Sequence, residues 1–324
     1  MKELIKWLSI AVLLFGIQSV KAENSELSIE CSWGRLSATL AVPEGGSNTV
    51  VVIIAGSGPT DRDGNSMAAG LRSYSYSMLS NELVAEGFAV LRYDKRGIGQ
   101  SPIPDADVPN LVFENYVDDV EQIALNMRQR GFERVILAGH SEGGLIAMVA
   151  AERRSVELDG VVLLCAAGYS IDNLLLSQLG AQLMPANIVL MYQAEQIIKR
   201  LKGGERLAES QVPKELLSLF HPVVQPFLIS EMQYDPQQLI AGCEQPLLII
   251  GGGRDIQVSV DNAEVLAKSQ PKAQYRLFES MSHVLKDTDL SDRMGQLTSV
   301  YSNSNYPLTK GLAQTIAEFI NNIK

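Results

Sequence analysis

The sequence predicts an α/β fold with a mostly parallel central sheet, helices on both faces of the sheet, and a helical insertion. Three observations support this prediction. Apolar strand patterns alternate with amphipathic helix patterns over residues 49–168 and again over 243–324. Between them, residues 169–242 carry clusters of leucine, isoleucine and methionine and no evident strand pattern. Finally, the apolar run Val135–Ala138 leads into a turn of the form G-x-S-x-G.

The predicted elements follow one another in an order typical of this class. Two opening strands joined near Gly34 would cover an edge of the larger sheet. In chain order we expect strands over 26–32, 36–42 and 49–55, a helix over 78–87, a strand over 88–93, a helix over 111–129, a strand over 135–138, a helix over 144–153 and a strand over 161–166. After the insertion we expect a strand over 246–250, a helix over 259–269, a strand over 274–278 and a helix over 308–323. The core therefore occupies 23–168 and 243–324, and a helical cap occupies 169–242.

The composition fits a folded protein with a large core. The chain has 324 residues, of which 46% are hydrophobic and 20% charged, and its formal net charge is −10 at pH 7. This acidity argues against nucleic acid as a partner and against an anionic membrane surface. The sequence contains no internal repeat and no Pro/Gly/Ser-rich linker that would mark a domain boundary.

The first 22 residues have the pattern of a secretory signal peptide. Lys2 and Lys6 precede an apolar run over 7–17, and Val20-Lys21-Ala22 places small residues for cleavage before Glu23. The run is shorter than the roughly 18 apolar residues of a membrane span, although an uncleaved anchor stays open as an alternative. Cleavage would remove three lysines and one glutamate, leaving a charge of −12. This pattern predicts a periplasmic or secreted protein.

The turn Gly139-His140-Ser141-Glu142-Gly143 lies between a predicted strand and a predicted helix. In such a turn the serine is held in a strained backbone conformation and its hydroxyl is exposed. The strand and the helix then pass so closely that the residues two before and two after the serine must lack bulk, which Gly139 and Gly143 satisfy. Without that context, Ser141 could be an ordinary helix N-cap.

Other polar loops follow the predicted strands at their carboxyl ends. Gly56–Asn65 and Asp94–Ser101 follow two strands of the first half, Asp255 follows the strand over 246–250, and His283 follows the last strand. Carboxyl ends of parallel strands meet at one edge of a sheet, which is where such folds place their sites. A serine hydroxyl needs a base to act as a nucleophile at neutral pH, and a carboxylate can orient that base.

On these residues the chain resembles the α/β-hydrolase superfamily, which uses the order nucleophile, acid, histidine. More narrowly, Gly56–Gly64, Arg92–Gly99 and Tyr234–Pro236 before Cys243–Pro246 resemble a bacterial branch of esterases and serine aminopeptidase (S33)-like hydrolases. The resemblance covers nearly everything from Thr49 to the C-terminus outside the insertion.

The resemblance implies a catalytic triad of Ser141 as nucleophile, His283 as general base and Asp255 as the acid that orients His283. The oxyanion would be bound by the backbone N–H groups of Glu142 and Ser57, with Gly58 as the next candidate. Before this loop the sequence has Ala55-Gly56 in place of the common His-Gly form.

Each assignment has a plain structural alternative. A loop histidine such as His283 is often a surface residue, and a loop aspartate such as Asp255 can be a turn former. The rival bases are poorer, because His140 is fixed beside the serine and is expected to point into the fold, while His221 lies in the insertion before a proline.

The other charged residues in these loops are expected to have structural rather than catalytic roles. Charges of alternating sign in tight loops usually satisfy one another or nearby backbone groups, and this reading covers Asp61, Arg62, Asp63, Asp94 and Arg96. A role for Arg62 or Arg96 in binding a substrate carboxylate is the alternative.

The three histidines and three cysteines fit no metal spacing, and no phosphate or dinucleotide loop is present, so we expect no metal and no cofactor. Cys31, Cys165 and Cys243 would permit one disulfide, with the pair undetermined.

The sequence therefore predicts a secreted serine hydrolase that cleaves a carboxylic ester through an acyl-enzyme intermediate. The alternatives are a serine aminopeptidase-like amide hydrolase and an idle α/β-hydrolase fold that serves as a binding protein. We expect a small-molecule ester or amide as the partner. The cap over 169–242 would form a lid and one wall of the substrate pocket. Its apolar residues would favour an apolar substrate, unless they form the cap's own core.

Overall fold

The computed structural model describes residues 22–323 of the chain. The predicted signal peptide over 1–22 lies outside the described residues except for its last position. Among the helices of the described residues, none combines the length and the apolar character that crossing a membrane requires.

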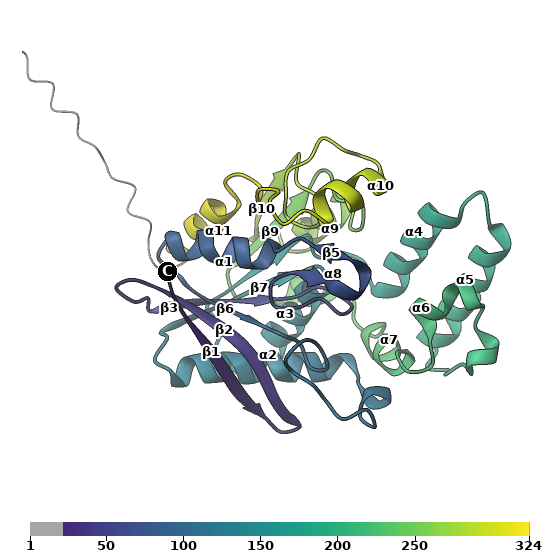
Figure 1. Cartoon of the computed structure of the whole chain (residues 1–324), viewed down its shortest axis with the longest axis horizontal. Coiled ribbons are helices and arrows are strands. Elements are labelled where there is room, and N and C mark those ends of the chain that lie inside the picture. Colours follow the sequence, from purple (N-terminus) through teal and green to yellow (C-terminus); the bar gives the residue numbers. More distant parts are fainter. Residues whose placement is uncertain (1–21, 324) are drawn as a thin grey trace, which may run out of the picture.

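Within the described residues, an eight-stranded sheet forms the centre of the molecule (Figure 1). Its order is β1–β2–β6–β3–β7–β8–β9–β10; the β1–β2 and β2–β6 pairs are antiparallel and all other pairs are parallel. The predicted α/β class with a mostly parallel sheet is therefore confirmed. The strands are β1 (Ala22–Cys31), β2 (Gly34–Pro43), β3 (Thr49–Ile54), β6 (Ala89–Tyr93), β7 (Arg134–His140), β8 (Gly160–Leu164), β9 (Leu247–Gly252) and β10 (Gln274–Phe278).

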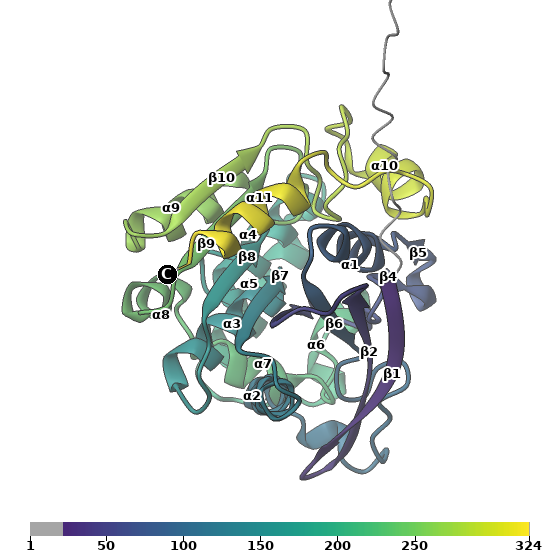
Figure 2. The ribbon, with the colours of Figure 1, turned by 90° about the vertical axis from the view of Figure 1, so that its left-hand side faces the viewer.

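Helices cover both faces of this sheet (Figure 2). α1 (Ser75–Ala85) and α11 (Leu312–Asn321) pack on one face, while α2 (Phe113–Gln129), α3 (Glu142–Arg153) and α9 (Val260–Ser269) pack on the other. The central strands are buried on both faces, which explains their nearly continuous apolar sequences. Two apolar cores result, one on each side of the sheet.

The segment between β8 and β9 is helical, and most of it projects to one side of the core (Figure 1). Many of its leucine, isoleucine and methionine side chains pack against one another and form a core of the insertion itself, whereas Met184, Ile188 and Leu219 are exposed. The last helix, α8, instead packs against α3 and α9 of the main domain. The helices of the insertion are α4 (Ile171–Leu183), α5 (Ile188–Lys202), α6 (Leu217–Phe220), α7 (Gln225–Glu231) and α8 (Pro236–Gly242), with the short 3-10 turns η3 (Glu209–Gln211) and η4 (Lys214–Leu216).

Several elements differ from the prediction. The first two strands are longer than expected, because they pair with each other over their whole length from Ala22 opposite Pro43 to Cys31 opposite Gly34. The last helix begins only at Leu312, because Leu308 is held in a bridge to Lys286. The sequence pattern missed five short elements, β4 (Asn65–Ser66), η1 (Met67–Ala69), β5 (Leu71–Arg72), η2 (Val108–Asn110) and α10 (Arg293–Gln296), and the π-helical turn η5 (Leu297–Tyr301).

Candidate active site

Ser141 lies in a sharp turn between β7 and α3. Its backbone has φ 54° and ψ −121°, a left-handed conformation that is strained for a residue with a side chain. The close approach predicted for this turn is present: a Cβ at Gly139 would lie 2.2 Å from the carbonyl oxygen of Gly143, and one at Gly143 would lie 2.3 Å from that of Ile54. Only glycine fits at these two positions. The local geometry is that of a nucleophile elbow.

His283 and Asp255 are in direct contact. Nδ1 of His283 lies 2.7 Å from Oδ2 of Asp255. The other carboxylate oxygen of Asp255 accepts hydrogen bonds from the backbone N–H groups of Gln257 and Val258. Because a carboxylate can only accept, Nδ1 of His283 carries the hydrogen in this pair and Nε2 is left with a lone pair. That tautomer is the one in which an imidazole can take a proton from a serine.

Ser141 and His283 both line a cavity of about 140 Å³. Most of its lining residues carry a hydroxyl group, whereas the aliphatic ones are Leu71 and Val284. Among the described residues, no aspartate, glutamate, lysine or arginine lines the cavity. The walls come from 56–76, the elbow, and the loops after β9 and β10.

The insertion contributes no lining residue to this cavity. The expectation that residues 169–242 form a wall of the substrate pocket is therefore wrong for this cavity. The physical reason is that the buried apolar side chains of α4 to α7 pack against one another in the insertion's own core. The wall is built instead by the loop between β3 and α1, whose short β4–β5 pair the sequence pattern did not predict.

His140, the residue before Ser141, is buried and points into the fold as expected. Its Nε2 lies 2.7 Å from the backbone carbonyl oxygen of His283, and its Nδ1 lies 2.7 Å from Oη of Tyr76. A carbonyl oxygen only accepts, so Nε2 carries the hydrogen and Nδ1 accepts from the Tyr76 hydroxyl. Burial, and next the neighbouring His283, lower the pKa of His140 to about 3. The ring is therefore neutral at physiological pH and has a structural role.

The two expected oxyanion donors lie beside the cavity. Ser57 lines the cavity, and Glu142 is the first residue of α3, directly after Ser141. Neither the Ser57 N–H nor the Glu142 N–H donates a hydrogen bond to any other described residue. Both N–H groups are thus free to bind a ligand, and the Glu142 N–H has the added field of the α3 N-terminus.

Lys95, which no sequence pattern singled out, has an ammonium group buried close to these donors. Its Nζ lies 2.5 Å from the carbonyl oxygen of Gly56 and 3.1 Å from Oε1 of Glu142. Only 1% of the Lys95 side chain is exposed. Buried lysines are uncommon and normally paired, but a single lysine among loop charges gives no sequence signal of burial.

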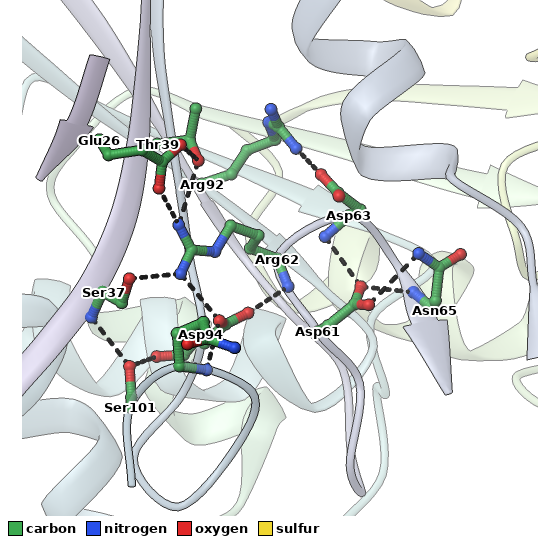
Figure 3. A network of polar contacts seen from close by, with 11 residues as sticks. Glu26, Ser37, Thr39, Asp61, Arg62, Asp63, Asn65, Arg92, Asp94 and Ser101 are labelled. Carbon is green, nitrogen blue, oxygen red and sulfur yellow. Dashed lines mark hydrogen bonds and ion pairs between the residues drawn. The ribbon is translucent and has the colours of Figure 1, made fainter. Parts of the chain in front are cut away.

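Of the five loop charges expected to be structural, Asp61, Arg62, Asp63 and Asp94 lie in one network (Figure 3). The Arg62 guanidinium donates to the carboxylates of Asp94 and Glu26 and to hydroxyl groups of the β2 strand. Asp94 also accepts from the backbone N–H groups of Arg62 and Gln100. Arg96 pairs separately with Asp119 of α2. These groups hold the loops after β3 and β6 against the β1–β2 hairpin, and neither arginine lines the cavity.

Cys165 lies behind the His283–Asp255 pair. Its Sγ, an Asp255 carboxylate oxygen and a ring nitrogen of His283 all lie within 4.8 Å of one another. Burial, and then the Asp255 charge, raise the pKa of the Cys165 thiol well above its usual value, so the sulfur keeps its proton. Cys31, Cys165 and Cys243 are all unpaired.

The sheet order and the elbow are those of α/β-hydrolases, and solved structures share the fold. Est1E from Butyrivibrio proteoclasticus, solved with ferulic acid bound, matches with a TM-score of 0.58 and 16% identity over 92% of this chain and 98% of Est1E. Esterase Pf2001 from Pyrococcus furiosus matches with a TM-score of 0.59 and 17% identity over 93% of this chain and 92% of that chain. The fold class is thus that of the α/β-hydrolases.

The particular family follows from the sequence. The family model described as serine aminopeptidase, S33, matches residues 69–289, and the chain belongs to this family of serine hydrolases. Esterase EstD from Thermotoga maritima is 25% identical over 256 residues, which cover 77% of this chain and 58% of EstD. The chain thus spans little more than half of the length of this curated relative. The predicted resemblance to the esterase and S33-like branch is confirmed.

Proposed function

We propose that this chain hydrolyses carboxylic esters through an acyl-enzyme intermediate formed on Ser141. The Ser141 hydroxyl attacks the ester carbonyl carbon while Nε2 of His283 takes its proton. His283 then returns the proton to the leaving alcohol, and a water molecule, activated by the same imidazole, releases the acid. Asp255 holds the ring and stabilises it when it is protonated. The N–H groups of Ser57 and Glu142 stabilise the oxyanion of each tetrahedral intermediate.

One observation carries this proposal. The 2.7 Å bond between Nδ1 of His283 and Oδ2 of Asp255 places the lone pair of the neutral imidazole on Nε2, and His283 shares its cavity with a serine in a strained elbow. The strained backbone supports the assignment, because such strain costs about 1–3 kcal/mol and persists where the position of a side chain matters.

The cavity favours an ester over the amide of an aminopeptidase substrate. An aminopeptidase must bind an α-ammonium group, and a carboxylate is the usual partner for such a charge. No acidic side chain among the described residues lines this cavity. Its volume of about 140 Å³ is close to the roughly 150 Å³ of a cavity that holds benzene, so the group bound here is small and uncharged.

Turnover of p-nitrophenyl esters of increasing acyl length, in parallel with aminoacyl anilides, tests this proposal. We expect acetyl and butyryl esters to react fastest and anilides to react at least about 10-fold more slowly. Ser141→Ala should lose both turnover and labelling by a fluorophosphonate probe. Faster cleavage of anilides would favour the aminopeptidase-like alternative. A wild-type protein that neither turns over nor takes up the probe would instead be a binding protein.

The place of action is part of the same proposal. The pattern of residues 1–22 supports export and cleavage after Ala22. Cell fractionation with intact-mass measurement tests it: a mature chain that begins at Glu23 outside the cytoplasm is the expected result, and a full-length cytoplasmic chain would contradict it.

A further inference from the structure

We infer that Lys95 is the positioning residue of the oxyanion hole, an inference that rests on the proposed ester hydrolysis. Lys95 lies in the loop after β6, outside the cavity, and its side chain is only 1% exposed. From there its ammonium group contacts both segments that supply the proposed oxyanion donors. The bond to the Gly56 carbonyl holds the peptide that carries the Ser57 N–H. The bond to the Glu142 side chain holds the first turn of α3, which carries the Glu142 N–H.

The contact with Gly56 acts through the peptide plane. The carbonyl of Gly56 and the N–H of Ser57 belong to the same peptide unit, and in a trans peptide these two groups point in opposite directions. A donor fixed on the carbonyl oxygen therefore fixes the direction of the N–H. Nζ of Lys95 lies 2.5 Å from this oxygen, and a charged donor also polarises the peptide and strengthens its N–H as a hydrogen-bond donor.

Gly56 is also held from its other side. Its N–H donates to Oη of Tyr76 at 3.1 Å, so Lys95 and Tyr76 together fix both of the peptide groups that flank this residue. A Cβ at Gly56 would lie 3.1 Å from Cβ of Ser141, which places this backbone against the nucleophile. A rotation of the Gly56–Ser57 peptide would therefore move an oxyanion donor at close range.

The second contact of Lys95 reaches the other donor residue. Oε1 of Glu142 accepts from Nζ at 3.1 Å, and the Glu142 side chain is 9% exposed. Nζ also lies 5.0 Å from the ring centroid of Tyr116, within the range of a cation–π contact. One ammonium group thus ties the loop after β3 to the first residue of α3, and its position is over-determined by three partners.

A further carboxyl group faces this pair from the insertion. Glu231, at the end of α7, is buried, and burial together with the Glu142 charge raises its pKa well above the usual value, while Lys95 opposes the shift. Glu142, whose carboxylate oxygen lies 3.1 Å from Nζ of Lys95, is the direct partner of the Lys95 charge. This arrangement leaves the ammonium group bound to the two oxyanion segments.

Lys95→Met tests the inference by removing the ammonium group while keeping a long side chain. We expect kcat on a short-chain ester to fall about 10- to 100-fold. Deleting a whole oxyanion donor typically lowers kcat about 100- to 1,000-fold, so the loss expected here does not exceed the lower end of that range. KM should change by less than about threefold, because the donors act on the transition state. The pH midpoint of kcat/KM should stay unchanged, because Lys95 does not touch His283. If Lys95 had only a structural role, its loss would not lower kcat while leaving both KM and the pH midpoint of kcat/KM unchanged.

Lys95→Met alone leaves the Glu142 carboxylate buried without its partner, which can destabilise the fold. The double variant Lys95→Met/Glu142→Gln removes both charges and is the decisive protein. It should unfold near the wild-type temperature and show the same loss of kcat as Lys95→Met. Glu142→Gln alone should lose less, because Lys95 still donates to Gly56.

Lys202→Met is the matched control, since it breaks a lysine–carboxylate pair with Asp172 in the insertion, away from the cavity. It should keep wild-type kcat. A folded double variant with wild-type kcat would overturn the role of Lys95 and leave the proposed hydrolase intact. A wild-type protein without Ser141-dependent turnover would remove the proposed function itself, and this inference with it.

Discussion

Nε2 of His140 lies 2.7 Å from the backbone carbonyl oxygen of His283, so the residue before the proposed nucleophile holds the loop of the proposed base. The two rings also pack together, with centroids 4.6 Å apart. Through Nδ1, the same imidazole accepts from Tyr76, whose oxygen accepts from Gly56. A buried chain of hydrogen bonds thus connects the oxyanion loop after β3 with the histidine loop after β10.

Tyr76→Phe should weaken both ends of this chain. The change leaves the Gly56 N–H and Nδ1 of His140 without a partner in a buried site, which costs about 1–3 kcal/mol of unfolding free energy. It also frees the Gly56–Ser57 peptide, so kcat on a short-chain ester should fall while KM changes little. Urea unfolding and steady-state kinetics measure the two effects. Tyr234→Phe, which loses a hydroxyl bond to Glu114 far from the cavity, should keep wild-type kcat; equal kcat losses in both variants would contradict this.

His140 should make the protein less stable in acid. Its pKa is lowered from 6.5 to about 3 in the folded state, so below pH 6.5 the unfolded chain binds a proton that the folded chain does not. The stabilisation is present above pH 6.5 and is lost as the pH falls towards 3, by up to about 1.4 kcal/mol per pH unit. In His140→Asn the unfolding free energy should depend less steeply on pH between 6 and 4. Parallel slopes for wild type and variant in urea titrations would refute the assignment.

The elements that the sequence predicted best are those whose patterns reflect burial on the sheet. β10 (Gln274–Phe278) was predicted at both ends, and the core helices within a few residues. The elbow was predictable because the backbone approach at Gly139 and Gly143 leaves glycine as the only residue that fits. Periodicity and steric necessity are both visible in a sequence.

The supporting residues of the site could not be predicted in this way. Lys95 and Tyr76 act through single contacts with the backbone of Gly56, and no periodicity marks such contacts. The origin of the cavity wall also had no signal, because the apolar clusters of the insertion fit a core and a substrate pocket equally well. Tertiary packing decided that question in favour of a core.

Gly139→Ala should prevent folding of the core. The new Cβ would lie 2.2 Å from a backbone oxygen of Gly143, and the strand and helix that flank the elbow cannot separate without disrupting the sheet. We expect no soluble protein, or a loss of several kcal/mol. Gly180→Ala is the matched control, because a Cβ there meets no atom within 4 Å and lies in α4. It should raise the unfolding free energy by about 0.5–1 kcal/mol. A soluble Gly139→Ala variant with wild-type stability would refute the close approach of the Gly139 and Gly143 backbones.

Arg62→Leu should destabilise the fold. Arg62 does not line the cavity, so any change in the cavity should follow only from this loss of stability. Arg62 is the cationic partner of Asp94, whose side chain is 4% exposed, and its loss leaves that carboxylate buried without a counter-charge. Removing one partner of a buried pair costs about 3–5 kcal/mol. Arg154→Leu, which breaks an exposed pair with Glu244, should cost about 1 kcal/mol or less. Chemical denaturation measures both, and equal costs would contradict the central place of Arg62 in the network.

The three cysteines should be unreactive in the folded protein and free of disulfides. Burial is the largest effect on each thiol; it raises the pKa of Cys31 and of Cys243 to about 11, and that of Cys165 well above its usual value. At pH 8 a thiol with a pKa of 11 is about 0.1% thiolate, the form that reacts with iodoacetamide. Intact-mass measurement should show no adduct on the native chain within minutes. Three adducts should appear after denaturation without reductant, whereas a single adduct would reveal a disulfide, and rapid native labelling would show a thiol less buried than its position implies.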